Sequence, residues 1–150
     1  MMYTGPMGDL KKQRRANRQQ VAALPLSYDE AGRVQVLLVT SRDTGRWVLP
    51  KGWLMKGKKP HRAAEQEAYE EAGLIGKVCK VPLGTYSYEK RLWTGSSVPC
   101  KVTVFPLRVE HHRDRWPEMN ERERRWFSPD EAALVVAEDG LRHLLRTVTQ

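Results

Sequence analysis

Hydrophobic residues along the chain form short runs separated by turn-forming or charged residues. Val34 to Val39 is β-branched and apolar apart from Gln35, as expected for a buried strand. Pro50 and Gly95-Ser96-Ser97 interrupt the pattern, because proline and glycine end strands and favour turns. The pattern predicts strands over residues 18–26, 34–40, 46–49, 77–88, 99–109 and 124–127, with loops over 52–59 and 110–120.

Helices are predicted in the middle of the chain and at its C-terminal end. Pro60 suits a first helical turn, residues 61–72 are strong helix formers, and Gly73 stands where a helix ends. Ser128-Pro129-Asp130-Glu131 combines an N-cap serine, a proline at the first helical position and a capping-box glutamate. Residues 141–148 add more helix. Strands around a central helix, with helix again at the end, predict an α/β fold: an α/β/α sandwich with a mixed β-sheet.

The composition fits one domain in a reducing compartment. The 150 residues, 40% of them hydrophobic, are enough for one core, so we expect a single domain over residues 18–150 behind a flexible basic leader, residues 1–17. No apolar run approaches the roughly 18 residues of a membrane helix, and none follows the basic residues 11–18 as a secretory signal requires. Cys79 and Cys100 have no metal-ligand spacing. We therefore expect a cytoplasmic monomer or homodimer without a membrane partner.

The net charge of +8 favours anionic partners. Nucleic acid, a phosphorylated metabolite and an anionic membrane surface all meet that description, and a surplus of charge for solubility is the plain alternative. Composition alone does not choose among them.

The central helix concentrates negative charge on one face. Glu67, Glu70 and Glu71 are spaced i, i+3 and i+4, which puts their carboxylates side by side, while Ala64 and Ala68 belong to a separate small-residue stripe that suits close packing on a sheet. Neighbouring carboxylates repel one another, and hard divalent cations such as Mg²⁺ and Mn²⁺ offset that repulsion through oxygen ligands. An ordinary solvated acidic face is the alternative for this pattern taken alone.

The acidic motif is part of a longer pattern that resembles a known family. Residues 52–74 match the full length of the Nudix box, G-x5-E-x7-R-E-U-x-E-E-x-G-U with U aliphatic, without a gap. The matching positions are Gly52, Glu67, Glu70, Glu71, Gly73 and Leu74, with Ala68 as a small stand-in for an aliphatic residue. Two positions depart, because Lys58 replaces the first box glutamate and Gln66 replaces the box arginine. The resemblance implies a Nudix-type sandwich and a metal-dependent pyrophosphohydrolase in which water attacks a phosphoanhydride.

The resemblance also implies roles for individual residues. Glu67, Glu70 and Glu71 would bind Mg²⁺ or Mn²⁺, the Lys51 carbonyl would add a ligand, and Glu67 or Glu70 would act as the base, Glu67 being preferred because it follows position 66. Many members of the family supply one more carboxylate from a distant segment. The candidates for it are Glu118, Glu121 and Glu123. The basic residues expected to hold substrate phosphates are Arg46, Lys51, Lys56, Lys58 and Lys59.

The turn before the box narrows the expected substrate. Pro50-Lys51-Gly52-Trp53 looks like the branch that cleaves diphosphoinositol polyphosphates and diadenosine polyphosphates, and the positive charge agrees with such anionic substrates. ADP-ribose, nucleoside triphosphates, other NDP-X compounds and 5′-triphosphate RNA ends stay open. Two other classes stay open as well. One is a catalytically weakened Nudix-fold sensor or scaffold, suggested by Lys58 and Gln66, and the other is a basic nucleic-acid-binding domain, although no RNA or DNA motif supports it.

Overall fold

The computed structural model describes residues 18–148, so the leader expected over residues 1–17 lies outside the described residues. The strands are β1 (Gln19–Tyr28), β2 (Val34–Thr40), β3 (Trp47–Val48), β4 (Lys51–Trp53), β5 (Leu74–Val78), β6 (Gly84–Arg91), β7 (Ser97–His112) and β8 (Arg124–Phe127). The helices are α2 (Pro60–Ala72), α3 (Pro129–Val135) and α4 (Asp139–Thr147). No helix within residues 18–148 is long and apolar enough to cross a membrane.

The strands form one mixed sheet, as predicted. Its main path runs β3-β2-β1-β7-β5, while β4, β6 and β8 pair with β1, β7 and β2. β1 and β7 run parallel at the centre, and the other pairs are antiparallel. Because β4 pairs with the start of β1, it delivers the following loop and α2 to one end of the sheet.

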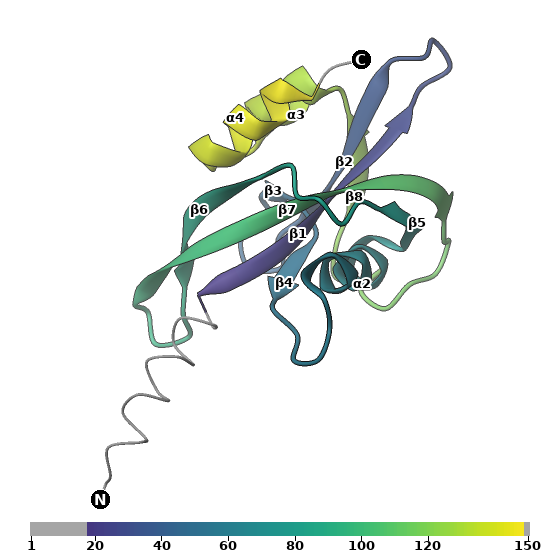
Figure 1. Cartoon of the computed structure of the whole chain (residues 1–150). Coiled ribbons are helices and arrows are strands. Elements are labelled where there is room, and N and C mark those ends of the chain that lie inside the picture. The colour runs from purple at the N-terminus through teal and green to yellow at the C-terminus, as the bar shows by residue number, and fades with distance from the viewer. Residues whose placement is uncertain (1–17, 149–150) are drawn as a thin grey trace, which may run out of the picture.

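Helices cover both faces of this sheet, which confirms the predicted α/β/α sandwich (Figure 1). Side chains on a strand point alternately to opposite faces, and β1 supplies both cores accordingly. Val21 and Ala23 pack with α2, whereas Ala22 and Leu24 pack with α3 and α4. The side of α2 that meets the sheet is made of alanines that are fully buried: Ala63, Ala64, Ala68 and Ala72.

The predicted boundaries of α2 and the predicted start of α3 are confirmed, whereas α4 begins two residues before the predicted residue 141 and ends at Thr147. Pro60 occupies the first turn of α2, and Gly73 ends the helix with a left-handed φ of 68°. Ser128 caps α3, with its side chain accepting from the Glu131 amide while Glu131 bonds back to the Ser128 amide. These caps satisfy backbone groups that a helix leaves without partners.

Several predicted strand and loop boundaries were wrong. The loop expected from residue 52 begins after Trp53, because Lys51–Trp53 is strand β4 and pairs with β1. The strand expected over residues 77–88 is two strands, β5 and β6, which both pair with β7 but are separated by residues 79–83. Pro82 in this gap has no amide hydrogen to give to a sheet. The loop expected from residue 110 begins later, because β7 continues to His112 to pair with β5.

Gly73 should be less replaceable than a glycine in an open turn. Gly73 and Gly32 share a left-handed φ, 68° and 78°, but a Cβ on Gly73 would lie 2.8 Å from the Trp116 ring, whereas nothing approaches Gly32 within 4 Å. We expect Gly32→Ala to lower the free energy of unfolding by about 1 kcal/mol, the usual cost of a left-handed alanine. Gly73→Ala should lower it by clearly more. Urea denaturation of both variants measures the difference, and equal losses would mean that the ring yields freely.

Candidate active site

A cleft opens where β4, α2 and β6 meet the segment between β7 and β8. It has two adjoining parts, a smaller one of ≈280 Å³ beside α2 and a larger one of ≈770 Å³ reaching towards α4. The residues that line both parts are Ser41, Asp43, Val48, Lys51, Tyr88 and Lys90. A single extended ligand could therefore occupy both.

The smaller part contains a cluster of three glutamates, Glu67, Glu71 and Glu118, and we call it the acidic end for that cluster. Basic side chains line it as well, namely Arg42, Lys51, Lys90 and Arg122. A Cβ on Gly52 would lie 2.3 Å from Glu67 Oε2, so glycine at this position is what lets the carboxylate come so near the β4 backbone. Glu71 is only 6% exposed, and its Oε1 accepts a hydrogen bond of 3.3 Å from the Lys51 amide.

Arg122 supplies the counter-charge for this acidic part. Its guanidinium, only 9% exposed, lies 2.8 Å from Glu118 Oε1 and 3.4 Å from Glu71 Oε2, and it also donates to the Thr40 carbonyl. In the structure, exposure alternates along Glu121-Arg122-Glu123-Arg124, so that both arginines are less exposed than the two glutamates.

Crowding and burial raise the pKa values of two carboxyls in this part of the cleft. Burial first, then the charges of Glu70 and Glu118, raises the pKa of Glu67 to about 6. Burial raises the pKa of Glu71 to about 8, although Arg122 opposes the rise. Both groups therefore hold a proton more readily than an exposed glutamate does.

Within residues 18–148, no three His, Cys, Asp or Glu side chains are grouped closely enough to hold a metal ion as they stand. The donor chemistry nevertheless fits a hard divalent cation. Glu67, Glu71 and Glu118 present carboxylate oxygens to one small space. After burial, repulsion from the charges of Glu70 and Glu118 contributes to the raised pKa of Glu67. A divalent cation would relieve that repulsion, as Arg122 now does in part.

Glu70 lies one step outside this group and is tied to the two positions that depart from the box. Gln66 donates to Glu70 Oε2 at 3.0 Å, and Lys58 donates to Gln66 Oε1. Lys58 and Gln66 are therefore partners of each other, and the glutamine amide links the lysine charge to a box carboxylate. Lys58 contacts the helix here and does not line the cleft.

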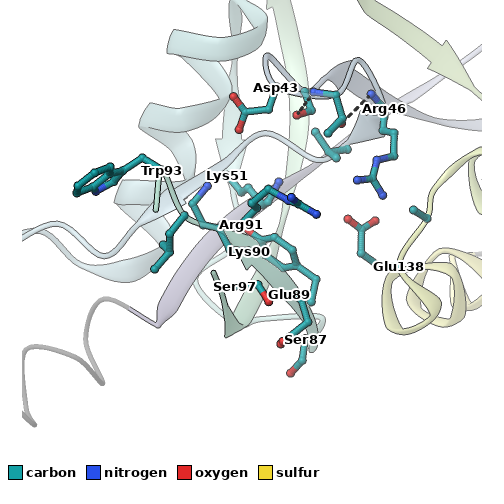
Figure 2. A pocket seen from close by; sticks show the side chains of 16 residues that line it. Asp43, Arg46, Lys51, Ser87, Glu89, Lys90, Arg91, Trp93, Ser97 and Glu138 are labelled. Atoms are coloured by element: carbon teal, nitrogen blue, oxygen red, sulfur yellow. Dashed lines mark hydrogen bonds between the residues drawn. The ribbon is translucent and has the colours of Figure 1, made fainter. Parts of the chain in front are cut away.

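The larger part of the cleft, which we call the basic end, has four basic side chains and three acidic ones, the latter being Asp43, Glu89 and Glu138. Figure 2 shows Arg46, Lys51, Lys90 and Arg91 around it, with the Glu138 carboxylate facing Arg46. Burial lowers the pKa of Lys51, whose ammonium lies 5.1 Å from the centre of the Tyr88 ring. The Tyr88 hydroxyl in turn donates to Gln20 Oε1 at 2.6 Å, which fixes the ring.

The structure thus brings together some of the predicted site residues and not others. Arg46 and Lys51 line the cleft, while Lys56, Lys58 and Lys59 are exposed and do not. Of the three candidates for an additional carboxylate, Glu118 alone lines it. Glu121 is paired with Arg42 at 3.1 Å, and Glu123 is exposed. Residues that sequence reasoning missed include Arg122, Glu138, Tyr88 and Gln20, which show no local motif.

Comparison with known proteins identifies the surrounding domain. The NUDIX domain model matches residues 17–148. The chain is 35% identical over 107 residues to Nudix hydrolase 12, mitochondrial, of Arabidopsis thaliana, which covers 69% of this chain and 53% of the relative. It is 32% identical over 105 residues to diphosphoinositol polyphosphate phosphohydrolase 3-alpha of Mus musculus, covering 68% of this chain and 60% of the relative. The chain spans about half the length of the first of these curated relatives.

Solved structures share the fold at low sequence identity. A C. elegans Ap4A hydrolase aligns with a TM-score of 0.58 at 18% identity, covering 85% of this chain and 92% of the other. The NUDIX domain of Shewanella oneidensis NrtR, solved with ADP ribose, aligns with a TM-score of 0.64 at 16% identity, covering 95% of both chains. At these identities the likeness establishes the sandwich fold alone.

The raised pKa values make the metal-free chain sensitive to pH. Because Glu71 binds its proton more tightly folded than unfolded, its contribution to stability is full below pH about 4.5 and is lost as the pH rises through about 8. We expect urea denaturation with a chelator present to give a free energy of unfolding that falls from pH 5 to pH 8. Glu71→Gln should flatten this slope, and Glu65→Gln, a partly exposed change on the same helix, should keep it. A slope that Glu71→Gln leaves unchanged contradicts the assignment.

Proposed function

We propose that this chain, which belongs to the NUDIX domain family, is a metal-dependent pyrophosphohydrolase acting on a phosphate-rich small molecule. The observation that carries the proposal is the polarity of the cleft. Glu67, Glu71 and Glu118 cluster at one end, Arg46 and Arg91 line the other, and Lys51 and Lys90 line both. An acidic end suits a cation, and a basic end suits the phosphates that the cation helps to activate.

The acidic end would hold the metal. Glu67, Glu71 and Glu118 are the side-chain ligands that the cleft favours, with Glu70 and the Lys51 carbonyl as further oxygen donors. Bound Mg²⁺ or Mn²⁺ would neutralise charge on the phosphate oxygens, which is the main electrostatic demand of phosphoryl transfer. The choice between these two metals is left to experiment.

Side chains of the protein would accept the proton of the attacking water and hold the substrate phosphates. Glu67 is the preferred base, because its pKa of about 6 lets it take a proton from the attacking water near neutral pH. Lys51 lies where the two parts of the cleft meet. It would hold the phosphate chain across the bond that breaks, and Arg46, Lys90 and Arg91 would hold the phosphates beyond it.

The substrate class that fits best carries several phosphates. Diphosphoinositol polyphosphates are favoured by the 32% identity to the mouse diphosphoinositol polyphosphate phosphohydrolase and by the basic end of the cleft. Diadenosine polyphosphates and other NDP-X compounds share the same phosphoanhydride. Trp93, 95% exposed at the rim, offers a surface on which a nucleobase could stack.

Removing one acidic ligand should abolish most of the activity. We expect Glu71→Gln and Glu67→Gln to lower kcat by at least about a hundredfold while the fold persists, because each loses a metal-binding or proton-accepting oxygen. Glu65→Gln is the matched control, since Glu65 is on the same helix and pairs with Arg62 at 3.1 Å. The measurement is phosphate release with Mg²⁺ and circular dichroism for folding. Near-normal turnover in both variants would instead favour a Nudix-fold sensor or scaffold.

The basic end should make binding depend on salt and on phosphate number. We expect added salt to weaken binding of an inositol hexaphosphate more than that of ADP-ribose, because more charge pairs are screened. Arg46→Ala and Arg91→Ala should reduce the salt dependence, whereas Lys56→Ala, an exposed lysine outside the cleft, should not. Calorimetric titration at two salt concentrations tests this. A larger effect from Lys56→Ala would contradict this assignment, and would indicate that the exposed lysines before α2 hold the substrate phosphates.

A further inference from the structure

The segment between β7 and β8 seals the C-terminal end of α2. The last carbonyls of a helix lack partners within it, and here four consecutive ones find partners outside. Glu70 O accepts from the Glu118 amide at 3.1 Å, and Gly73 O accepts from the Arg113 amide at 2.8 Å. Between them, Glu71 O accepts from the Trp116 indole at 3.0 Å, and Ala72 O accepts at 2.7 Å from Arg124, the first residue of β8.

Trp116 and Arg124 form the centre of this seal. The Arg124 guanidinium lies 3.9 Å from the centre of the Trp116 ring, in a cation–π stack. The ring itself lies against Gly73, where any side chain would clash. The last turn of α2 has no basic residue of its own, so Arg124 also provides the positive charge that a helix C-terminus favours.

The same segment delivers two charged groups to the acidic end of the cleft. Glu118 follows Trp116 by two residues and is held by its main chain to Glu70. Arg122 lies between Glu118 and Glu71, at 2.8 and 3.4 Å. The position of Glu118 relative to Glu67 and Glu71 therefore depends on how the β7–β8 segment is attached to the end of α2. Trp116 and Arg124 make part of that attachment.

We propose that Trp116 and Arg124 are positioning residues: they fasten the β7–β8 segment to the end of α2 and thereby keep Glu118 in the same part of the cleft as Glu67 and Glu71, where a divalent cation would draw the three carboxylates together. The proposal rests on the proposed function in one respect, that Glu118 helps to hold the cation. Neither residue lines the cleft. Their effect on metal affinity therefore passes through Glu118.

A helix cap that serves stability alone is the competing explanation, and a double-mutant cycle separates the two. Trp116→Phe keeps an aromatic ring beside Arg124 but loses the N–H that Glu71 O accepts. If Trp116 acts through Glu118, its effect on metal binding should disappear once Glu118 is replaced by glutamine. If it only stabilises the fold, its effect should be independent of Glu118.

The probe is Mn²⁺ alone, titrated into the full chain and followed by the electron paramagnetic resonance signal of the free ion. We expect Trp116→Phe to weaken Mn²⁺ binding roughly tenfold, the usual scale for a residue that orients a ligand. Glu118→Gln should weaken it as well, and the double variant should bind no more weakly than Glu118→Gln. Arg124→Lys keeps the positive charge but cannot both stack on the Trp116 ring and donate to the Ala72 carbonyl in the same way. It should lower Mn²⁺ affinity by less than Trp116→Phe does.

Gly32→Ala is the control for stability, because it destabilises a turn far from the helix end along the chain. It should leave Mn²⁺ affinity at the parent value. Parent-like affinity in Trp116→Phe, or losses that multiply in the double variant, would overturn the positioning role. A chain that binds Mn²⁺ with this dependence yet hydrolyses no phosphoanhydride would overturn the proposed function alone. Absence of Mn²⁺ binding in the parent chain would overturn both.

Discussion

The close packing of α2 on the sheet is the constraint on which the rest of the site depends. Its sheet-facing positions are fully buried alanines, Ala63, Ala64, Ala68 and Ala72, and small side chains let the helix axis come near the strands. The glutamates at positions 67 and 71 are consequently brought against β4, where Gly52 leaves room for one carboxylate and the Lys51 amide bonds the other. Larger residues on the alanine stripe would move both carboxylates away from the cleft.

Carboxylates placed in this way need opposite charge, and the surrounding segments provide it. Arg122 reaches Glu71 and Glu118 from the approach to β8, and Lys51 approaches from β4. Burial outweighs this compensation, so the pKa values of Glu67 and Glu71 remain raised. Under the proposed function, a divalent cation would replace the protons on these carboxyl groups, and the basic side chains of the larger part would hold a polyphosphate.

Local patterns were enough to predict the sandwich, the bounds of α2 and the capping box at Ser128, because caps and helix faces depend on residues close in sequence. They were also enough to place Glu67 and Glu71 together, since i, i+4 spacing fixes that on any helix. Local patterns could not predict which residues pair across segments that are distant in the sequence. From the sequence, Glu118 was one of three equal candidates for the additional carboxylate. In the structure, Glu121 pairs with Arg42 and Glu123 is exposed. The partnership of Lys58 with Gln66 depends likewise on how the loop folds back onto the helix.

The central claim, that water attacks a phosphoanhydride at this cleft with the help of a metal, is tested most directly in ¹⁸O-labelled water. The full chain is incubated separately with a diphosphoinositol polyphosphate and with a diadenosine polyphosphate, in the presence of either Mg²⁺ or a chelator. The masses of the products are then measured by mass spectrometry. We expect one ¹⁸O atom in a phosphate product of at least one substrate, and only when Mg²⁺ is present. Labelled product in the presence of the chelator, or no labelled product from either substrate with Mg²⁺, would contradict it.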